Sequence, residues 1–444
     1  MSFPRIWRVL PLATGFLATG LLAAPASAQT EIQLWHAMGG ALGQKVADIA
    51  AGFNASQSDF VVTAEHKGTY TEILTEAIEA FSNGEPPHII HVFDVGTATM
   101  LAADGFAYPL HEVFADTEEP FDPAIYIPAI AGYYGDADGN LLALPFNSST
   151  PVLFYNREAV IGAGFEELPP AWPDLAEVLG MVQEAGIPCG FTTAWQSWVQ
   201  IENFSAWHDV PFATQDNGFA GLDAELTING DAQIAHIEAF ADWTSTDLFR
   251  FGGRRGDARS LFLTGECAAY FGSSAAYAAI NANAGFEFGI APLPHWPEIA
   301  AEPQNSVVGG AALWTLRGRE EADYAGVANF MAYLSSPGVQ ADWHQYTGYL
   351  PVTRTAYELT REQGFYDANP GTEVGILQLV GKSPTALSKG PRLGGFVAIR
   401  DIINEELEAV WSGDKSARNA LNDATVRGNE VLRSFETESG VSAE

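Results

Sequence analysis

Four small polar residues interrupt an apolar stretch, and their position suggests binding chemistry. In LPFNSSTPVLFYN (residues 144–156), Asn147, Ser148, Ser149 and Thr150 stand between apolar neighbours. A strand through this stretch would bury their hydroxyl and amide groups, and a buried polar group without a partner costs a few kcal/mol. We therefore expect these residues to face a cleft, where a ligand or water satisfies their hydrogen bonds.

Pairs of small polar or glycine residues also stand where other predicted strands end, and we call these pairs the strand tips. Ser273 and Ser274 close the apolar run CAAYFGSS, and the pairs Gly309-Gly310 and Gly348-Tyr349 stand in comparable places. Each pair alone fits an ordinary turn. Their recurrence predicts that the tips line a single cleft.

The segment AWQSWVQIENFSAW (residues 194–207) adds aromatic surface. It interleaves aromatic residues with polar ones, namely Trp195, Trp198, Phe204 and Trp207 with Gln196, Gln200, Glu202 and Asn203. Flat aromatic faces beside amides suit a polyol or sugar-like ligand. Most of these aromatics are expected in the core, and Trp195 is the first candidate to face a ligand.

Catalytic and metal-binding patterns find little support. The chain has no Gly-x-Ser-x-Gly elbow, no phosphate loop with Lys-Ser/Thr and no His-Glu-x-x-His. His88 and His91 point to opposite faces of a predicted strand, which indicates a structural role. Asp136 and Asp138 resemble the start of a calcium loop, but Asn147 stands where that loop requires Glu. We instead predict that GYYGDADGNLLALPF forms a hairpin, with two strands around an Asp-Ala-Asp-Gly turn. We predict no catalytic residue, no metal ion and no cofactor.

The N-terminus has the pattern of a secretory signal. Arg5 and Arg8 precede a short apolar run, and Ala26-Ser27-Ala28 is a small-x-small cleavage pattern. We predict cleavage after Ala28 and export to the periplasm, with no later membrane span. The formal net charge of −34 argues against nucleic acid and anionic lipid as partners.

The elements that must position these residues alternate between strand and helix. The periodicity predicts strands near 31–38, 59–68 and 88–96, with helices over 42–53 and 71–81 between them. This order is typical of a parallel sheet with helices on both faces, whose ligands gather beyond the carboxyl ends of the strands. A mature chain of this length exceeds one ordinary core, which predicts two lobes. Whether Cys189 and Cys267 pair stays open on spacing alone.

Long motifs identify a family resemblance. They are WHAMGGALG, FDVGTATM, PFNSSTPVLFYN, WQSWVQIENFSAW, GGAALW, WHQYTGYLP and LTREQGFY. Over residues 32–435 the chain resembles the periplasmic sn-glycerol-3-phosphate-binding components of ABC importers, within extracellular solute-binding protein family 1. The resemblance implies an α/β Venus-flytrap fold without enzymatic activity. It also implies capture of glycerol-3-phosphate or glycerophosphodiesters such as glycerophosphocholine, and delivery by a monomeric receptor to a membrane permease driven by an ATPase.

The resemblance also implies a set of ligand-binding residues. These are Tyr70, Asp94, Ser149, Trp195, Ser273, Gly310, Tyr349 and Arg400. Hydroxyls, a backbone N–H and a guanidinium suit a phosphate ester, because charge-assisted bonds to Arg are about twice as strong as neutral ones. Asp94 departs from the family pattern, which usually has Glu at this position. We expect its carboxylate at the glycerol end of the ligand. Because its side chain is shorter, the carboxylate either reaches the glycerol hydroxyls through water or leaves room for a different head group.

A two-lobed receptor needs hinge crossings. We expect them at 145–156, near 306–310 and near 357–365. Lobe I then comprises residues 29–147 plus about 308–360, and lobe II comprises 148–307 plus about 361–444. Two alternatives remain: the same fold with an oligosaccharide or other polyol as ligand, and an exported glycerophosphodiester hydrolase.

Overall fold

The computed structural model describes residues 1–2, 4, 29–103 and 105–439. The predicted signal segment and its cleavage after Ala28 lie, apart from its first few residues, outside this range. Within the described residues, no helix combines the length and apolar character that a membrane crossing requires.

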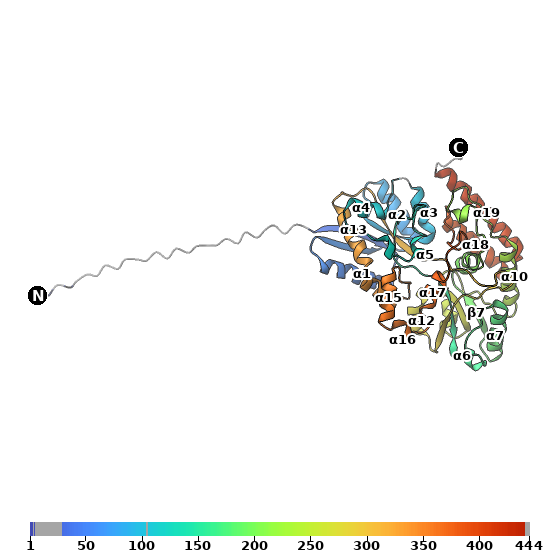
Figure 1. The fold of residues 1–444 in the computed structure, drawn as a ribbon. Helices are drawn as coiled ribbons and strands as arrows, with labels where there is room; N and C mark the ends of the chain where they lie inside the picture. Colours follow the sequence, from blue (N-terminus) through green and yellow to red (C-terminus); the bar gives the residue numbers. More distant parts are fainter. Residues whose placement is uncertain (3, 5–28, 104, 440–444) are drawn as a thin grey trace.

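Two separate β-sheets organise the chain into two lobes (Figure 1). The first has the order β2-β1-β3-β10-β4, with β5 also paired to β10. Its strands are β1 (Thr30–His36), β2 (Phe60–His66), β3 (Ile89–Phe93), β4 (Ala107–Tyr108), β5 (Leu144–Pro145) and β10 (Ala311–Leu316). β1 is parallel to β2 and β3, as the βαβ pattern predicts, whereas β10 returns from far along the chain and runs antiparallel to β3.

The second sheet has the order β7-β8-β6-β9. Its strands are β6 (Pro151–Asn156), β7 (Cys189–Thr193), β8 (Cys267–Ser273) and β9 (Phe288–Ala291). β7 and β8 are parallel, and β6 is antiparallel to β8 and β9. Cys189 and Cys267 face each other in the β7–β8 register and form a disulfide, which resolves the question that their spacing left open.

Helices pack on both sheets. Those before β10 are α1 (Gly40–Ser56), α2 (Tyr70–Ser82), α3 (Thr97–Ala102), α4 (Leu110–Asp116), α5 (Pro128–Ala131), α6 (Arg157–Gly162), α7 (Trp172–Glu184), α8 (Phe204–Trp207), α9 (Thr214–Gly218, with left-handed residues inside), α10 (Asp231–Thr244), α11 (Arg259–Leu263) and α12 (Tyr277–Asn283). Those after β10 are α13 (Asp323–Leu334), α14 (Pro337–Thr347), α15 (Arg354–Glu362), α16 (Phe365–Ala368), α17 (Val374–Val380), α18 (Phe396–Trp411) and α19 (Ala417–Glu438). Short turns of other helix types are η1 (Asp94–Gly96), η2 (Pro123–Ile125), η4 (Ser274–Ala276) and the π-helix η3 (Trp198–Asn203).

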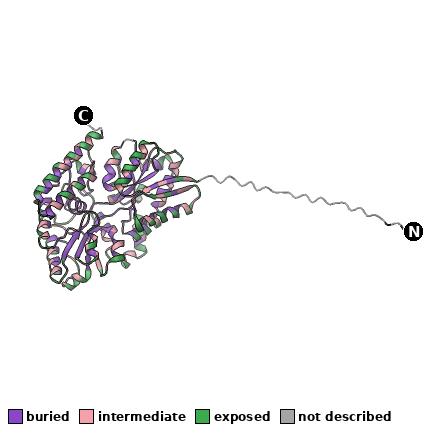
Figure 2. Ribbon diagram, turned by 180° about the vertical axis from the view of Figure 1, so that it is seen from behind, coloured by how far each residue is buried: buried purple, intermediate pink, exposed green. Residues whose placement is uncertain are grey.

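The apolar cores follow the sheets (Figure 2). One core joins the first sheet to α1, α2, α4 and α13, and another joins one face of the second sheet to α7, α10, α18 and α19. A smaller core around Phe154, Phe262 and Tyr270 covers the opposite face of the second sheet. Each sheet therefore has its own core, as expected for a chain too long for one.

The polar stretch after β5 connects the two sheets. β5 belongs to the first sheet and β6 to the second, so the chain passes from one to the other between Pro145 and Pro151. Residues 306–310 return beside it: the Thr150 hydroxyl donates to Ser306 Oγ at 2.7 Å, and Ser149 and Gly309 exchange both backbone hydrogen bonds. The expectation that ligand or water satisfies the whole stretch is wrong for Thr150, whose partner is this second segment. It is also wrong for Asn147, whose side-chain amide bonds to His91 and Tyr70.

Two further expectations need correction. The sequence GYYGDADGNLLALPF predicts a hairpin, but only a single bridge, Gly135 to Leu141, forms there. The Asp136 carboxylate instead accepts the backbone N–H groups of Asp138 and Asn140, which closes a tight loop, and the chain beyond it pairs with β10. The first sheet is also mixed rather than purely parallel, because β10 comes from a distant part of the sequence.

Candidate ligand-binding site

Arg400 lies at the centre of a buried cluster between the two sheets. It belongs to α18, which begins after Gly395, a residue with the positive φ of 61° that glycine tolerates. The guanidinium donates to Asp94 at 2.6 Å and, through Nε and Nη2, to both carboxylate oxygens of Glu202 at 2.7 Å. Only 12% of the Arg400 side chain is exposed. We call Asp94, Glu202 and Arg400 the charge triad.

Asp94 reaches the triad from the first sheet. It follows β3 directly and begins η1, and its backbone N–H donates to the Gly310 carbonyl at 2.9 Å. Its own carbonyl accepts the Tyr133 hydroxyl, which also donates to the carbonyl of Pro391. Backbone bonds therefore hold Asp94 in place without using its carboxylate.

Glu202 reaches the triad from the π-helix η3, beside the second sheet. A π-helix is rare and often marks a functional site. Sequence reasoning counted Glu202 among polar residues that would suit a polyol, and did not connect it to Arg400. Its neighbours are structural: the Gln200 side-chain amide donates to the Thr193 hydroxyl, and Asn203 Oδ1 accepts the backbone N–H of Val307. The available signal was the single charged residue of the aromatic-rich segment 194–207, because a buried carboxylate requires a cationic partner.

The triad carries more negative than positive charge. Burial raises the pKa of Glu202. The charge and hydrogen bonds of Arg400 oppose this rise, and the smaller repulsion from Asp94 adds to it, so the pKa stays raised. Burial by itself would lower the pKa of Arg400, but attraction from Asp94 and Glu202 leaves it raised, so the guanidinium stays protonated. Asp94 is thus an ion-pair partner of Arg400, the residue that the sequence assigns to the phosphate.

Two tyrosines border the triad. Tyr70 is the first residue of α2, because Thr69 and Glu72 form a reciprocal capping box that starts the helix there. Its hydroxyl accepts the Asn147 amide at 3.1 Å, and its ring stacks on Phe93. Burial raises the pKa of Tyr70, with Tyr349 and Asp94 contributing, and burial likewise raises the pKa of Tyr349. Both phenols are therefore neutral near pH 7, where each can donate its O–H.

Ser149 and Gly310 lie where the two crossing segments pair. Gly310 has φ of 101°, and a Cβ there would stand 2.0 Å from the Asn147 carbonyl oxygen, so only glycine fits. Since Asp94 bonds to Gly310, and Ser149 bonds to the neighbouring Gly309, these residues form one contiguous group with the triad. The predicted set of Tyr70, Asp94, Ser149, Gly310 and Arg400 is thus brought together.

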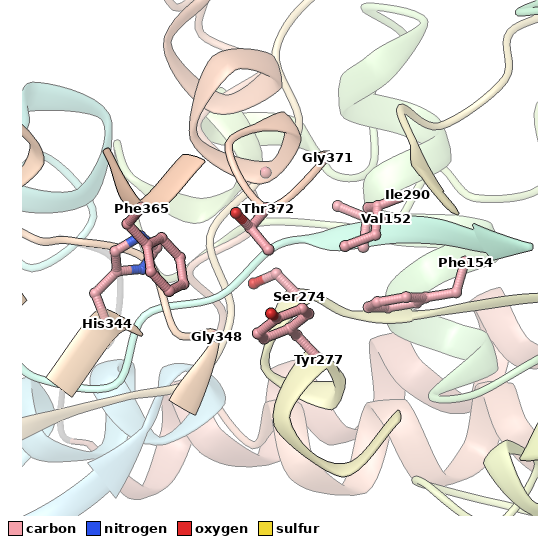
Figure 3. A pocket seen from close by; sticks show the side chains of 11 residues that line it. Val152, Phe154, Ser274, Tyr277, Ile290, His344, Gly348, Phe365, Gly371 and Thr372 are labelled. Carbon is pink, nitrogen blue, oxygen red and sulfur yellow. The ribbon is translucent and has the colours of Figure 1, made fainter. Parts of the chain in front are cut away.

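The two serines at the end of β8, Ser273 and Ser274, have different surroundings. The Ser273 hydroxyl accepts the backbone N–H of Ala275 and caps η4. Ser274 lines a cavity of about 10 Å³, room for one water molecule, together with Tyr277 and Thr372 (Figure 3). The Ser274 hydroxyl is buried and has no partner within the described residues. Gly348 borders the same cavity, so Tyr349, the next residue, approaches the end of β8 from the first lobe.

Trp195 lies at the carboxyl end of β7, on the same edge as the serine pair. It is 40% exposed, whereas Trp198, Phe204 and Trp207 of the same segment are buried. Its φ of 45° is unusual for a tryptophan, and its backbone N–H donates to the Arg255 carbonyl. The structure therefore separates one accessible indole from three core aromatics.

The assembled groups suit a polar ligand that bridges the two lobes. A buried guanidinium donates to carboxylates from both lobes, and those carboxylates can also accept hydroxyl groups. His88 and His91 are buried and accept backbone N–H groups of Gln33 and Ala37, as their structural interpretation requires.

Comparisons with known proteins agree with this geometry. The family model of the bacterial extracellular solute-binding proteins matches residues 48–373. The sn-glycerol-3-phosphate-binding periplasmic protein UgpB of Yersinia pseudotuberculosis is 45% identical over 93% of this chain and 95% of its own length. The protein of that name from Salmonella typhimurium is 44% identical over 96% of this chain and 97% of its own.

Solved structures show the same fold. UgpB of Mycobacterium tuberculosis, determined in complex with glycerophosphocholine, superposes with a TM-score of 0.75 at 21% identity, over 92% of this chain and all of that one. The GacH receptor of Streptomyces glaucescens superposes with a TM-score of 0.76 at 18% identity, over 92% of this chain and all of its own. The chain belongs to the bacterial extracellular solute-binding protein family, as a relative of the periplasmic UgpB proteins.

Proposed function

We propose that this protein is a periplasmic receptor that captures sn-glycerol-3-phosphate or glycerophosphodiesters such as glycerophosphocholine and delivers them to an ABC import permease. The observation that carries the proposal is the buried Arg400, which meets groups of both lobes at one place. Relatives with about 45% identity over nearly the whole chain carry glycerol-3-phosphate binding in their names, which supports the same ligand class here.

The ligand's two ends would meet different groups. Arg400, the hydroxyls of Ser149, Ser273 and Tyr349, and the Gly310 N–H are donors, so they suit the phosphate. Asp94 and Tyr70 suit the glycerol hydroxyls, and the exposed indole of Trp195 offers an apolar face to the rest of the ligand. Asp94 accepts from Arg400 through Oδ2, so its other carboxylate oxygen can accept a glycerol hydroxyl while the ion pair remains.

The remaining assignments follow from this role. We propose that the signal segment is cleaved after Ala28 and that the mature protein acts as a monomer without catalytic activity. The lobes comprise residues 29–147 with about 308–360, and 148–307 with about 361–444. The connections between the sheets would absorb the closing motion, since hinges commonly lie at the ends of secondary-structure elements.

Titration calorimetry on the mature protein tests the ligand class. Glycerol-3-phosphate and glycerophosphocholine are titrated in parallel with maltose as a neutral sugar. At least one phosphate ester is expected to bind, and Arg400→Met is expected to remove that binding. Arg427→Met is the matched control, because Arg427 also pairs with carboxylates in the same lobe but lies on α19 and contacts Glu405 and Glu406.

Other outcomes point to the alternatives. Binding of maltose but of neither phosphate ester would favour an oligosaccharide receptor. A ligand that binds the Arg400→Met variant as tightly as the wild-type protein would favour it as well. Release of choline from glycerophosphocholine during the titration would favour the hydrolase. Absence of binding by every ligand at millimolar concentration would overturn the proposed function.

A further inference from the structure

Glu202 completes the charge triad from a position that the predicted ligand set does not include. We propose that Glu202 is a positioning residue for Arg400, and that its carboxylate takes up a proton from solvent when a phosphate ester binds. This inference rests on the proposed function, because it concerns how the same site accommodates an anion.

The contacts show which edge of the guanidinium Glu202 controls. Glu202 accepts from Nε and Nη2 of Arg400, and Asp94 accepts from Nη2 as well. Such a two-point contact fixes the plane of the guanidinium. A phosphate oxygen then approaches Nη1, or replaces Asp94 at Nη2, while Glu202 keeps the other edge.

Glu202 and Asp94 differ in how firmly they are attached to Arg400. Glu202 and Arg400 both belong to elements packed beside the second sheet, so their ion pair persists when the lobes move apart. Asp94 follows β3 of the first sheet, so opening of the lobes carries it away from Arg400. Glu202 is therefore the permanent partner, and Asp94 is the exchangeable one.

The neighbourhood of Glu202 leaves its negative charge in excess. Only 1% of its side chain is exposed, so solvent does not screen it. The charged and titratable groups around it are Arg400 on α18, Asp94 on η1, Tyr133 and Tyr134 after α5, and, beyond Tyr133, Arg392. Burial keeps the pKa of both tyrosines raised and their side chains neutral. Arg392 donates to the Gly135 carbonyl and stacks on Phe219, so its guanidinium is engaged away from the triad.

Binding of a phosphate ester increases the excess of negative charge around Arg400. The triad alone has two carboxylates and one guanidinium, and the ligand adds at least one more negative charge beside them. Burial and Asp94 raise the pKa of Glu202 against the opposing effect of Arg400, and a further anion near Arg400 raises it again. Protonation of Glu202 removes one charge and leaves a neutral carboxyl that still accepts from Nε.

Calorimetry in buffers of different ionisation enthalpy measures this proton directly. Glycerophosphocholine is the main probe, because its phosphodiester has no group that titrates near neutral pH, and glycerol-3-phosphate is titrated beside it. In the wild-type protein we expect net proton uptake when the ligand binds, and an affinity that falls as pH rises through the range in which the free protein releases that proton. Glu202→Gln should abolish the uptake and flatten the pH profile.

Glu406→Gln is the matched control. Glu406 is also a buried carboxylate of α18, with 6% of its side chain exposed, but its partners are Lys415 and Arg427. This variant should keep the proton uptake of the wild type. Binding of a phosphate ester by the wild-type protein with no proton uptake would overturn the inference even if Glu202→Gln does not fold, and so would unchanged uptake in a folded Glu202→Gln protein. Failure of every phosphate ester to bind would instead reject the proposed function.

Discussion

Replacement of Arg400 by methionine should destabilise the protein by an amount that depends on pH. The substitution keeps an apolar stem of similar length and removes the cation, which leaves Glu202 buried and unpaired. The variant protein then folds most readily when Glu202 is protonated. From a reference pKa of about 4.3, neutralising a carboxylate costs about 3.7 kcal/mol at pH 7 and about 1 kcal/mol at pH 5. The loss at neutral pH agrees with the range of about 3–5 kcal/mol for breaking a buried ion pair.

The sign of the pH dependence follows from the carboxyl group. In the Arg400→Met variant the folded-state pKa of Glu202 rises above its unfolded value, so the variant loses stability as pH rises and recovers it as pH falls toward that value. Urea unfolding of wild type and variant at about pH 7 and pH 5 measures the difference. The double variant Arg400→Met, Glu202→Gln should recover part of the loss at pH 7, because Asp94 is then the one triad carboxylate left without its cationic partner.

The control separates the triad from ion pairs in general. Arg427→Met removes a more exposed arginine, with 41% of its side chain accessible, and should cost about 1 kcal/mol or less with little dependence on pH. A cost below about 1 kcal/mol for Arg400→Met at pH 7 would refute the reasoning, because a buried unpaired Glu202 must cost more than that. An equal cost at both pH values would refute it as well.

Three further predictions concern other parts of the structure. Gly310→Ala places a Cβ 2.0 Å from the Asn147 carbonyl at a positive φ, and should reduce ligand affinity at least tenfold and lower the melting temperature, as calorimetry and thermal unfolding would show. Trp195→Ala should weaken ligand binding while the melting temperature changes little, because the indole is 40% exposed; a loss of many degrees would instead indicate a core role. Replacing both Cys189 and Cys267 by serine opens a loop with a sequence separation of 78 and should cost about 2–5 kcal/mol in urea unfolding, with ligand affinity unchanged.

Sequence periodicity predicted the local elements well. The expected helix over 71–81 is α2 (Tyr70–Ser82), and the expected strand over 59–68 is β2 (Phe60–His66). These predictions work because a helix or strand shows its buried face as a period in the chain itself. The failure at GYYGDADGNLLALPF has the opposite cause, since Asp136 closes a loop with its side chain and the following residues pair with a distant strand.

The candidate site was predictable in part. The resemblance supplied Arg400 and Asp94, and the accessible position of Trp195 agrees with its choice among the four aromatics. Glu202 was read as one polar residue among several, and the disulfide between Cys189 and Cys267 stayed open. Thr150 was expected to face a ligand, but in the structure its hydroxyl donates a hydrogen bond to Ser306 of the neighbouring segment.

The amino-acid sequence by itself determined the family, the alternation of helix and strand, and the chemical types available to a ligand. Only the tertiary structure decided that Arg400 is shared by two carboxylates, 198 and 306 residues away along the chain. The physical reason is that periodicity and capping act over a few neighbouring residues, whereas an ion pair depends on distance in space. Burial then decides how strongly that pair acts, and burial exists only once both sheets and their helices have packed.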